Sequence, residues 1–342
     1  MKDDEKHHVI TEVANKIREG NKFLVSSHVN PEGDAIGSAL AIAQGLKDLG
    51  KEVTVFFEDQ IPEIYQFLPF SGEVIHEFDS ENRYDVTVVV DCGELDRVGE
   101  KFKSFQHKGV VINLDHHYAN TRFGDVNLID GEASSTGEIV YEVLSSLSVE
   151  ITTDIANNIY VSIMTDTGSF RYSSSTARAF FIASEMVKAG VKPWEIAQSV
   201  YESYPDKKLK LLGEVLQTLE ISNNGRIASV YVTQEMMQRL GATKDLIDGY
   251  VNYPRSIAGV DVAFLLSEVS SNTLKGTSTL KGTSKYKVSF RSKGRINVAE
   301  IANNLGGGGH ANASGCVVEG SLDEVKKIIK DLAEKKMKEK NL

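Results

Sequence analysis

Short apolar runs and amphipathic segments take turns along this chain, and their order predicts an α/β protein. The runs of strand length lie at residues 22–27, 53–57, 86–90 and 110–114. A longer segment at 35–49 has apolar residues at helical spacing, and Gly50 follows it as a stop signal. Strand, helix and strand in this order predict a parallel sheet, and uninterrupted apolar strands are typical of a sheet that is covered on both faces.

Further helices complete a first domain, an open parallel sheet that we expect to span residues 1–190. Helical periodicity predicts these helices at residues 8–18, 135–144 and 155–164. Residues 191–221 are also largely helical in pattern, with an interruption at Tyr204-Pro205-Asp206, and we interpret them as a linker. The chain has 342 residues, more than the roughly 100–200 of one domain, which supports a second domain.

A second, smaller α/β domain is predicted at residues 222–342. Its strands are expected at 226–232, 260–269 and 286–291, and its helices at 298–305 and 322–336. The sequence Leu-Lys-Gly-Thr-Ser occurs twice between the last two strands, at 274–278 and 280–284. We interpret this repeat as a long hairpin loop and assign it no chemistry.

Composition and charge narrow the classes of function. A hydrophobic content of 41% and a charged content of 25% are those of an ordinary soluble globular protein. The net charge of −10 argues against a protein that neutralises many phosphates of a long nucleic acid, whereas a small anionic substrate remains compatible. Two cysteines, no apolar leader and no apolar run of about 20 residues predict a cytoplasmic protein.

Acidic and histidine side chains stand at the ends of three predicted strands. His28 follows the strand at 22–27, Asp91 follows the strand at 86–90, and Asp115-His116-His117 follow the strand at 110–114. In open α/β sheets, ligands bind at the carboxyl edge, because the loops there converge over one crevice. Asp166 comes just after the helix at 155–164, so a fourth segment adds another carboxylate to the expected site.

The donors at this edge predict a metal site that is rich in carboxylate and contains no cysteine. The candidate ligands are His28, Glu32, Asp34, Asp91, His116 and Asp166. Such a set suits Mn²⁺ or Mg²⁺ better than structural zinc, and it is large enough for two ions. Two ions about 3.5–4 Å apart can share a hydroxide nucleophile and clamp the oxygens of a phosphoryl displacement.

Each of these residues taken alone also has an ordinary structural interpretation. An acid at a strand end is often a helix cap or a hydrogen-bonding loop residue. Asp34, in particular, is placed to cap the helix that we expect to begin at Ala35. The two roles are compatible, because a carboxylate has two oxygens.

A glycine-rich segment near the end of the chain predicts an anion-binding site. Residues 306–315 contain four successive glycines followed by His310, and Arg291-Ser292-Lys293-Gly294 follow a predicted strand. Backbone N–H groups of such glycines can approach phosphate closely, His310 adds a donor, and Arg291 can clamp an anion through two bonds. The expected substrate-binding residues are Arg255, Arg291, Ser292, Gly307, Gly308, Gly309 and His310. The alternative is a flexible connector.

Together these segments resemble the DHH phosphoesterase superfamily. Four segments resemble the four signatures of that family: His28 to Asp34, the strand ending at Asp91, Asp115-His116-His117, and Asp166-Thr167-Gly168. Arg291 to Gly294 and the segment 306–315 resemble the DHH-associated carboxy-terminal domain. Within the family, the chain is most similar to the soluble nano-RNases, described as oligoribonucleases and 3′-phosphoadenosine 5′-phosphate phosphatases.

The resemblance implies a manganese-dependent hydrolase whose active site lies in the cleft between its two domains. A bridging hydroxide would attack phosphorus, and Asp115, His116 and His117 would form the catalytic group, with His117 as a substrate contact or proton donor. The second domain would hold the nucleotide through Arg291, Ser292, the glycine loop and His310. Glu32 departs from the family, which most often has aspartate there, so its carboxylate would sit about one methylene further out.

The preferred function is therefore hydrolysis of short oligoribonucleotides or linear dinucleotides, and also of 3′-phosphoadenosine 5′-phosphate. A cyclic-dinucleotide phosphodiesterase or an exopolyphosphatase-like phosphohydrolase is the alternative within the superfamily. A nucleotide-binding sensor with weakened catalysis is the alternative of another class, and Glu32 is its support. The expected partners are short RNA or nucleotide bisphosphates, without membrane or long nucleic acid, and a homodimer is compatible with the sequence.

Overall fold

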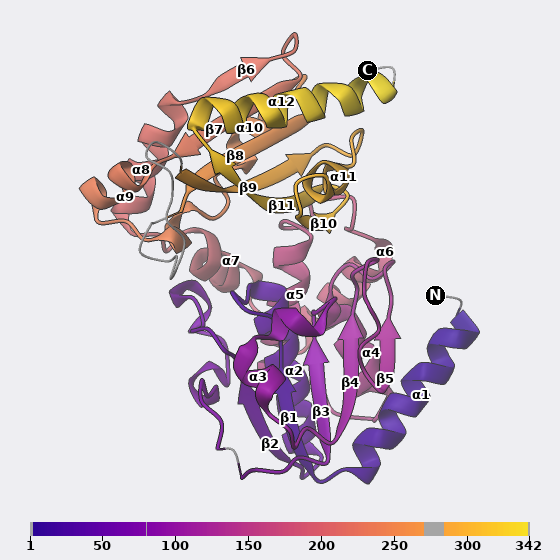
Figure 1. The fold of residues 1–342 in the computed structure, drawn as a ribbon. Helices are drawn as coiled ribbons and strands as arrows, with labels where there is room; N and C mark the ends of the chain where they lie inside the picture. The colour runs from indigo at the N-terminus through magenta and orange to yellow at the C-terminus, as the bar shows by residue number, and fades with distance from the viewer. Residues whose placement is uncertain (1–2, 80, 270–283, 341–342) are drawn as a thin grey trace. The chain divides into compact units, whose positions relative to one another are not determined.

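The computed structural model describes residues 3–79, 81–269 and 284–340. The chain divides into two compact units, Met1–Ser203 and Tyr204–Leu342, coloured indigo to magenta and orange to yellow in Figure 1. The boundary falls inside the segment that we interpreted as a linker. The repeated Leu-Lys-Gly-Thr-Ser sequence lies outside the described residues, apart from its last serine.

The first unit is built on a five-stranded parallel sheet in the order β2-β1-β3-β4-β5 (Figure 1). Its strands are β1 (Lys22–Ser26), β2 (Glu52–Phe56), β3 (Val86–Val90), β4 (Val110–Asp115) and β5 (Val126–Ile129). The α/β class and the parallel sheet are thus confirmed. The sequence pattern did not predict β5, because four residues are too few to show a period, and the strand is defined by its pairing with β4.

Apolar side chains cover both faces of this sheet. The helices of the unit are α1 (Asp3–Glu19), α2 (Gly33–Asp48), α3 (Glu100–Ser104), α4 (Thr136–Ser146), α5 (Thr153–Asp166), α6 (Ala177–Lys188) and α7 (Pro193–Tyr201). One face packs Val25, Val88 and Leu114 against the apolar sides of α1, α2, α4 and α5. The other face packs Leu24 and Val89 against a smaller cluster that includes Phe102 of α3. Coverage on both faces explains why these strands have no polar alternation.

Small residues bring α2 and α5 unusually close. A Cβ atom on Gly37 would lie 2.4 Å from the carbonyl oxygen of Asn158, and one on Gly33 would lie 2.5 Å from Oγ1 of Thr165. The first turn of α2 therefore faces the last turn of α5. This packing places Asp34 at the start of one helix near Asp166 at the end of the other.

The second unit carries a six-stranded mixed sheet in the order β10-β11-β9-β8-β7-β6. Its strands are β6 (Glu220–Ser222), β7 (Ile227–Val232), β8 (Val262–Glu268), β9 (Ser284–Ser292), β10 (Gly308–His310) and β11 (Ala313–Gly320). Its helices are α8 (Asp206–Gln217), α9 (Gln234–Leu240), α10 (Asn252–Ser256), α11 (Val298–Asn303) and α12 (Leu322–Glu339). A capping box of Ser321 and Glu324 begins α12, as expected for a helix after a strand.

The prediction that Asp34 caps α2 is wrong. The helix begins at Gly33, its N-cap is Glu32, and Asp34 lies inside the first turn. The Glu32 side chain makes no capping hydrogen bond, so this helix start has no side-chain cap. Within the described residues, no helix combines the length and the apolarity needed to cross a membrane.

Candidate metal centre

Three chain segments stand at the carboxyl edge of the first sheet: His28 after β1, Asp91 after β3, and Asp115-His116-His117, which begins with the last residue of β4. Parallel pairing of β1, β3 and β4 brings these three chain ends side by side. Asp91 is almost fully buried and has a positive φ of 52°, which is uncommon for a residue other than glycine. Such strained backbone is characteristic of functional sites, because the surrounding structure must hold it.

The ring of His28 is held so that one nitrogen faces Asp91. Its Nδ1 lies 2.8 Å from the carbonyl oxygen of Val29, so Nδ1–H donates to that oxygen. Nε2 then lies 3.4 Å from Oδ2 of Asp91. Both side chains are buried, and an imidazole oriented through its second nitrogen in this way is the usual arrangement for a metal ligand.

His116 stands among three carboxylates that come from three different elements. Its Nδ1 lies 3.3 Å from the carbonyl oxygen of Ala133. Its Nε2 lies 3.5 Å from Oδ2 of Asp34, 3.7 Å from Oδ1 of Asp91 and 3.6 Å from Oδ2 of Asp166. These separations are longer than hydrogen bonds and close to the roughly 3 Å between neighbouring ligands of an ion coordinated at about 2.1 Å. Asp34, Asp91 and His116 lie close enough together to hold a metal ion, and Asp166 stands beside them.

Hydrogen bonds from helices α4, α5 and α2 hold the Asp34 carboxylate in place. The backbone N–H groups of Thr136 and Gly137, in the first turn of α4, donate to it over 2.9 and 3.3 Å. The hydroxyls of Ser162 and Ser38 donate over 2.6 and 2.9 Å. The amino end of a helix favours a nearby negative charge, so α4 stabilises Asp34 in its ionised form.

No motif in the sequence marks these supporting residues as part of a site. Their signal is instead the run Ser134-Ser135-Thr136-Gly137-Glu138, a cluster of small polar residues directly before an apolar helix. A Cβ on Gly137 would lie 2.1 Å from Oγ of Ser162, so glycine is required there for α4 to reach the site. Thr136 also contributes its hydroxyl, which donates to Asp91 over 3.3 Å.

Asp115 is fully buried, and both of its oxygens already accept hydrogen bonds. Oδ1 accepts from the backbone N–H of His116 over 2.9 Å and from Nδ1 of His117 over 2.6 Å. Oδ2 accepts from Nδ2 of Asn120 over 2.6 Å. Asp91, Asp115 and His117 also form a cluster that could hold a metal ion. Because its oxygens are engaged, however, Asp115 is better suited to orient His117 than to coordinate an ion directly.

Several buried carboxylates lie close together at this centre, and they shift the pKa values of one another and of His116. Burial and the charge of Asp91 outweigh the hydrogen bonds that favour the ionised form, and they raise the pKa of Asp34 to about 7. Burial likewise raises the pKa of Asp166 to about 6, although His116 opposes the shift. Burial alone would lower the pKa of His116, but the charges of Asp166, Asp34 and Asp91 raise it to about 9. These carboxylates need positive charge nearby, and a divalent cation supplies it when it replaces the protons.

Asp91 differs from its neighbours. Burial opposes its ionisation, but the hydrogen bond from His28 and the charges of the three histidines hold its pKa below the ordinary range. It lies between His28 on one side and His116 on the other. An ionised carboxylate in that position can serve as a ligand to a cation.

Glu32 is exposed at the N-cap of α2, and its charge raises the pKa of Asp166. The expected ligands His28, Asp34, Asp91, His116 and Asp166 thus come together in the first unit, and Glu32 stands at the margin of their cluster.

Most of the expected substrate residues of the second unit lie on the strands β9 and β10 or beside them. Arg291, at the end of β9, pairs with Ala313 of β11, and the buried Ser292 donates its hydroxyl to Asn312 over 3.1 Å. The glycine run differs from the expected loop, because Gly308 to His310 form the edge strand β10, in a hairpin with β11. Gly309 has φ 135° and leaves no room for a side chain against Ala313. Arg255 lies on the short helix α10.

Comparison with known proteins agrees with this architecture. The model of the DHH family, N-terminal domain, matches residues 22–163, and the model of the DHHA1 domain matches residues 224–338. The chain belongs to the DHH family. It is 32% identical over 321 residues to the bifunctional oligoribonuclease and PAP phosphatase NrnA of Thermus thermophilus, covering 94% of this chain and 91% of that protein.

Two solved structures are also similar. An exopolyphosphatase-related protein from Bacteroides fragilis superposes with a TM-score of 0.88 at 28% identity, covering 98% of each chain. RecJ of Thermus thermophilus, solved in complex with Mn²⁺, has a TM-score of 0.52 at 13% identity, covering 96% of this chain and 55% of RecJ. The second likeness concerns the fold alone.

Proposed function

We propose that this protein is a metal-dependent phosphoesterase that hydrolyses short oligoribonucleotides and linear dinucleotides to mononucleotides, and that it also removes the 3′-phosphate of 3′-phosphoadenosine 5′-phosphate. The observation that carries the proposal is the cluster of Asp34, Asp91, Asp166 and His116 around one point at the sheet edge. The similarity to an oligoribonuclease and PAP phosphatase over 94% of the chain supports the substrate class.

The proposed centre would take two divalent ions, and Asp91 would be a ligand in both sites. Asp34, His116 and Asp166 would complete one site, and His28 and Glu32 the other. The carboxylate-rich donor set favours Mn²⁺ over zinc, with Mg²⁺ as the other candidate. When bound, the ions supply a hydroxide nucleophile and Lewis acidity toward the phosphoryl oxygens.

His117 acts on the substrate in this proposal. Asp115 accepts the proton on Nδ1, which fixes the tautomer and directs Nε2 away from the carboxylate. A histidine oriented in this way can donate a hydrogen bond to a phosphoryl oxygen or a proton to the leaving oxygen. The same carboxylate stabilises the imidazolium form, and His117 accordingly has a raised pKa despite its burial.

The nucleotide is held by the second unit in this proposal. Arg291 supplies a guanidinium for phosphate, Ser292 a hydroxyl, and Gly307, Gly308 and Gly309 backbone N–H groups beside His310. Arg255 is a further phosphate contact. The net charge of −10 favours short substrates, because long nucleic acid is bound mainly through many neutralised phosphates. Two buried free cysteines fit a reducing compartment, and we place the activity in the cytoplasm.

Exopolyphosphatase-like activity is the second candidate, and the similarity to the Bacteroides fragilis protein favours it. A sensor with weakened catalysis is disfavoured by the five expected ligands that come together.

The experiment is a Mn²⁺-dependent hydrolysis assay with separate substrates: linear diadenylate, cyclic diadenylate, a 24-mer RNA, 3′-phosphoadenosine 5′-phosphate and polyphosphate. Asp91→Asn is the key variant, because asparagine keeps the shape and tolerates the positive φ. Asp96→Asn, at an exposed surface ion pair, is the matched control.

Release of mononucleotide from diadenylate, lost on the order of 100-fold or more in Asp91→Asn and retained in the control, would support the proposal, because losing metal assistance costs several kcal/mol of transition-state stabilisation. Turnover of polyphosphate alone would replace it with the second candidate. Tight nucleotide binding without any turnover would identify a sensor.

A further inference from the structure

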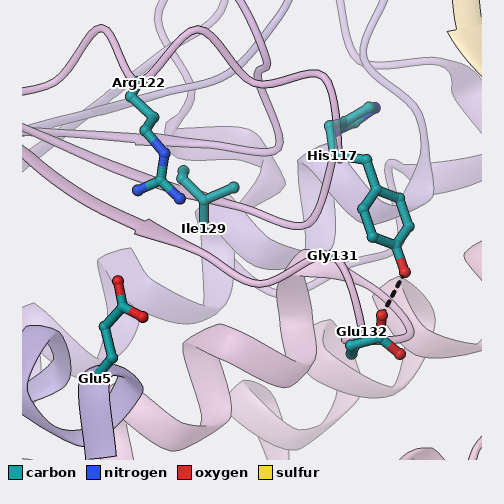
Figure 2. A pocket seen from close by; sticks show the side chains of 7 residues that line it. Glu5, His117, Arg122, Ile129, Gly131 and Glu132 are labelled. Atoms are coloured by element: carbon teal, nitrogen blue, oxygen red, sulfur yellow. Dashed lines mark hydrogen bonds between the residues drawn. The ribbon is translucent and has the colours of Figure 1, made fainter. Parts of the chain in front are cut away.

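A hollow of about 200 Å³ opens beside His117 in the first unit. Its lining comes from four places in the chain, which Figure 2 shows in part: Glu5 of α1, Tyr118 and Arg122 of the loop after β4, Ile129 of β5, and Gly131 and Glu132 of the following turn. Pockets that enclose drug-sized ligands measure roughly 300–1,000 Å³. This hollow therefore suits one planar ring system rather than a whole oligonucleotide.

Tyr118 offers an exposed aromatic ring that is already held in place. It is 76% exposed, yet a Cβ on Gly131 would lie 2.5 Å from its ring, so the ring lies directly over that glycine. Its hydroxyl donates to Oε1 of Glu132 over 2.7 Å, the bond drawn as a dashed line in Figure 2. An aromatic face that is exposed and fixed is the feature on which nucleic-acid-binding proteins stack single bases.

Arg122 is placed by the loop that also supports the metal centre. Its φ is 54°, and its backbone N–H donates to Oδ1 of Asn120 over 2.6 Å, while Nδ2 of the same Asn120 donates to Asp115. Over residues 3–79, 81–269 and 284–340, the Arg122 guanidinium takes part in no ion pair. Figure 2 shows Arg122 and Ile129 near each other, with Glu5 facing them from α1. A planar guanidinium beside an aliphatic side chain can stack on a base or donate hydrogen bonds to its ring nitrogens.

The charged residues that line the hollow favour some ligands over others. Away from His117, a phosphate group would meet two carboxylates, Glu5 and Glu132, and one guanidinium, so this part of the hollow is a poor anion site. A neutral base with an exocyclic amino group fits better, because that group can donate to a carboxylate while a ring nitrogen accepts from Arg122.

We propose that this hollow is a nucleobase subsite, in which Tyr118 stacks on the base of one nucleoside adjoining the scissile phosphate and Glu132 accepts from an exocyclic amino group. The inference rests on the proposed function, because His117 lines the hollow and is oriented by Asp115 of the metal centre. Adenine, cytosine and guanine carry such an amino group, and uracil carries none. The subsite thus prefers bases with an amino group.

The test compares Tyr118→Ala with three substrates: linear diadenylate and two phosphodiesters that contain one nucleoside, the methyl esters of adenosine 5′-phosphate and adenosine 3′-phosphate. We expect KM for diadenylate to rise about 5- to 100-fold, the range of a lost base–aromatic stack, with kcat within about twofold. KM for one methyl ester rises equally, and KM for the other stays unchanged. Tyr118→Phe keeps the stack and stays within about threefold of the wild type.

Two further variants sharpen the result. Trp194→Ala removes a comparably exposed aromatic side chain of α7 and leaves all three KM values unchanged. Glu132→Gln replaces an acceptor by a group that also donates, so the preference for diadenylate over diuridylate falls. An equal rise in KM for both methyl esters, a loss confined to kcat, or an unchanged KM for diadenylate would overturn the subsite.

Failure of the proposed function would look different. If the wild-type protein hydrolyses no phosphodiester, calorimetric titration of diadenylate still decides the inference. Weaker binding to Tyr118→Ala than to the wild type or to Trp194→Ala keeps the subsite in a protein without that activity, whereas identical binding to all three removes it.

Discussion

Asn120 donates a hydrogen bond to Asp115 over 2.6 Å, on the carboxylate oxygen opposite the one that holds His117. Its Nδ2 also lies 2.8 Å from Oδ1 of Asn113, and Asn113 donates to the carbonyl oxygens of Val89 and Cys92. This network joins β3, β4 and the following loop. The orientation of His117 therefore depends on a residue that has no place among the candidate metal ligands.

We predict that Asn120→Ala lowers kcat about tenfold or more, because a hydrogen bond to a charged group contributes about 1.5–3 kcal/mol and Asp115 would lose its anchor. The affinity for Mn²⁺ should change little. Steady-state kinetics with diadenylate and a metal titration measure the two effects. Asn15→Ala, at an exposed position of α1, is the control. A normal kcat in Asn120→Ala would show that His117 needs no such support.

Metal binding should stabilise the first unit against heat. Asp34, Asp91 and Asp166 crowd around His116, and a ligand present at 100 times its Kd adds about 2.7 kcal/mol. We expect Mn²⁺ to raise Tm by roughly 5–10 °C, for a unit of about 200 residues, and EDTA to reverse the rise. Differential scanning calorimetry measures both. Asp91→Asn should abolish the rise and Asp96→Asn should keep it; an equal rise in both variants would place the metal elsewhere.

The proposal that Glu32 is a metal ligand can be tested directly by substitution. We expect Glu32→Ala to raise the Mn²⁺ concentration for half-maximal activity by at least about tenfold, because a carboxylate ligand is lost while Asp91 and His28 remain. Glu32→Asp should keep activity, with an altered metal requirement. Metal titrations of both variants in the diadenylate assay provide the measurement. If Glu32→Ala titrates like the wild type, the exposed carboxylate is no ligand.

Substitution of glycine by alanine should have opposite effects at two helical positions, one crowded and one open. Gly37→Ala would place Cβ 2.4 Å from the carbonyl oxygen of Asn158, so overpacking should cost about 1–3 kcal/mol and displace Asp34. Gly213 of α8 has open space around it, and Gly213→Ala should stabilise the second unit by about 0.5–1 kcal/mol. Urea denaturation measures both free energies. A neutral Gly37→Ala would mean that the two helices can separate without cost.

The sequence by itself determined the class of fold and which donor residues meet at the carboxyl edge of the first sheet. Uninterrupted apolar strands require coverage on both faces, so the parallel sheet followed from the runs at 22–27, 86–90 and 110–114. Because parallel strands end at the same edge, the expected meeting of His28, Asp91 and His116 could be derived from their positions along the chain. The two-domain organisation followed from length and from the second set of strands.

Only the tertiary structure decided what surrounds those residues. Asp34 was expected as a cap because caps are recognised from local sequence, but its carboxylate accepts from Thr136 of α4, about 100 residues away. The roles of Asn120 and of Tyr118 likewise depend on contacts with Asp115 and Gly131, and neither residue type indicates a function on its own. Periodicity reports which face of an element is buried, whereas these contacts arise from the way helices and loops pack around the sheet, which no local pattern encodes.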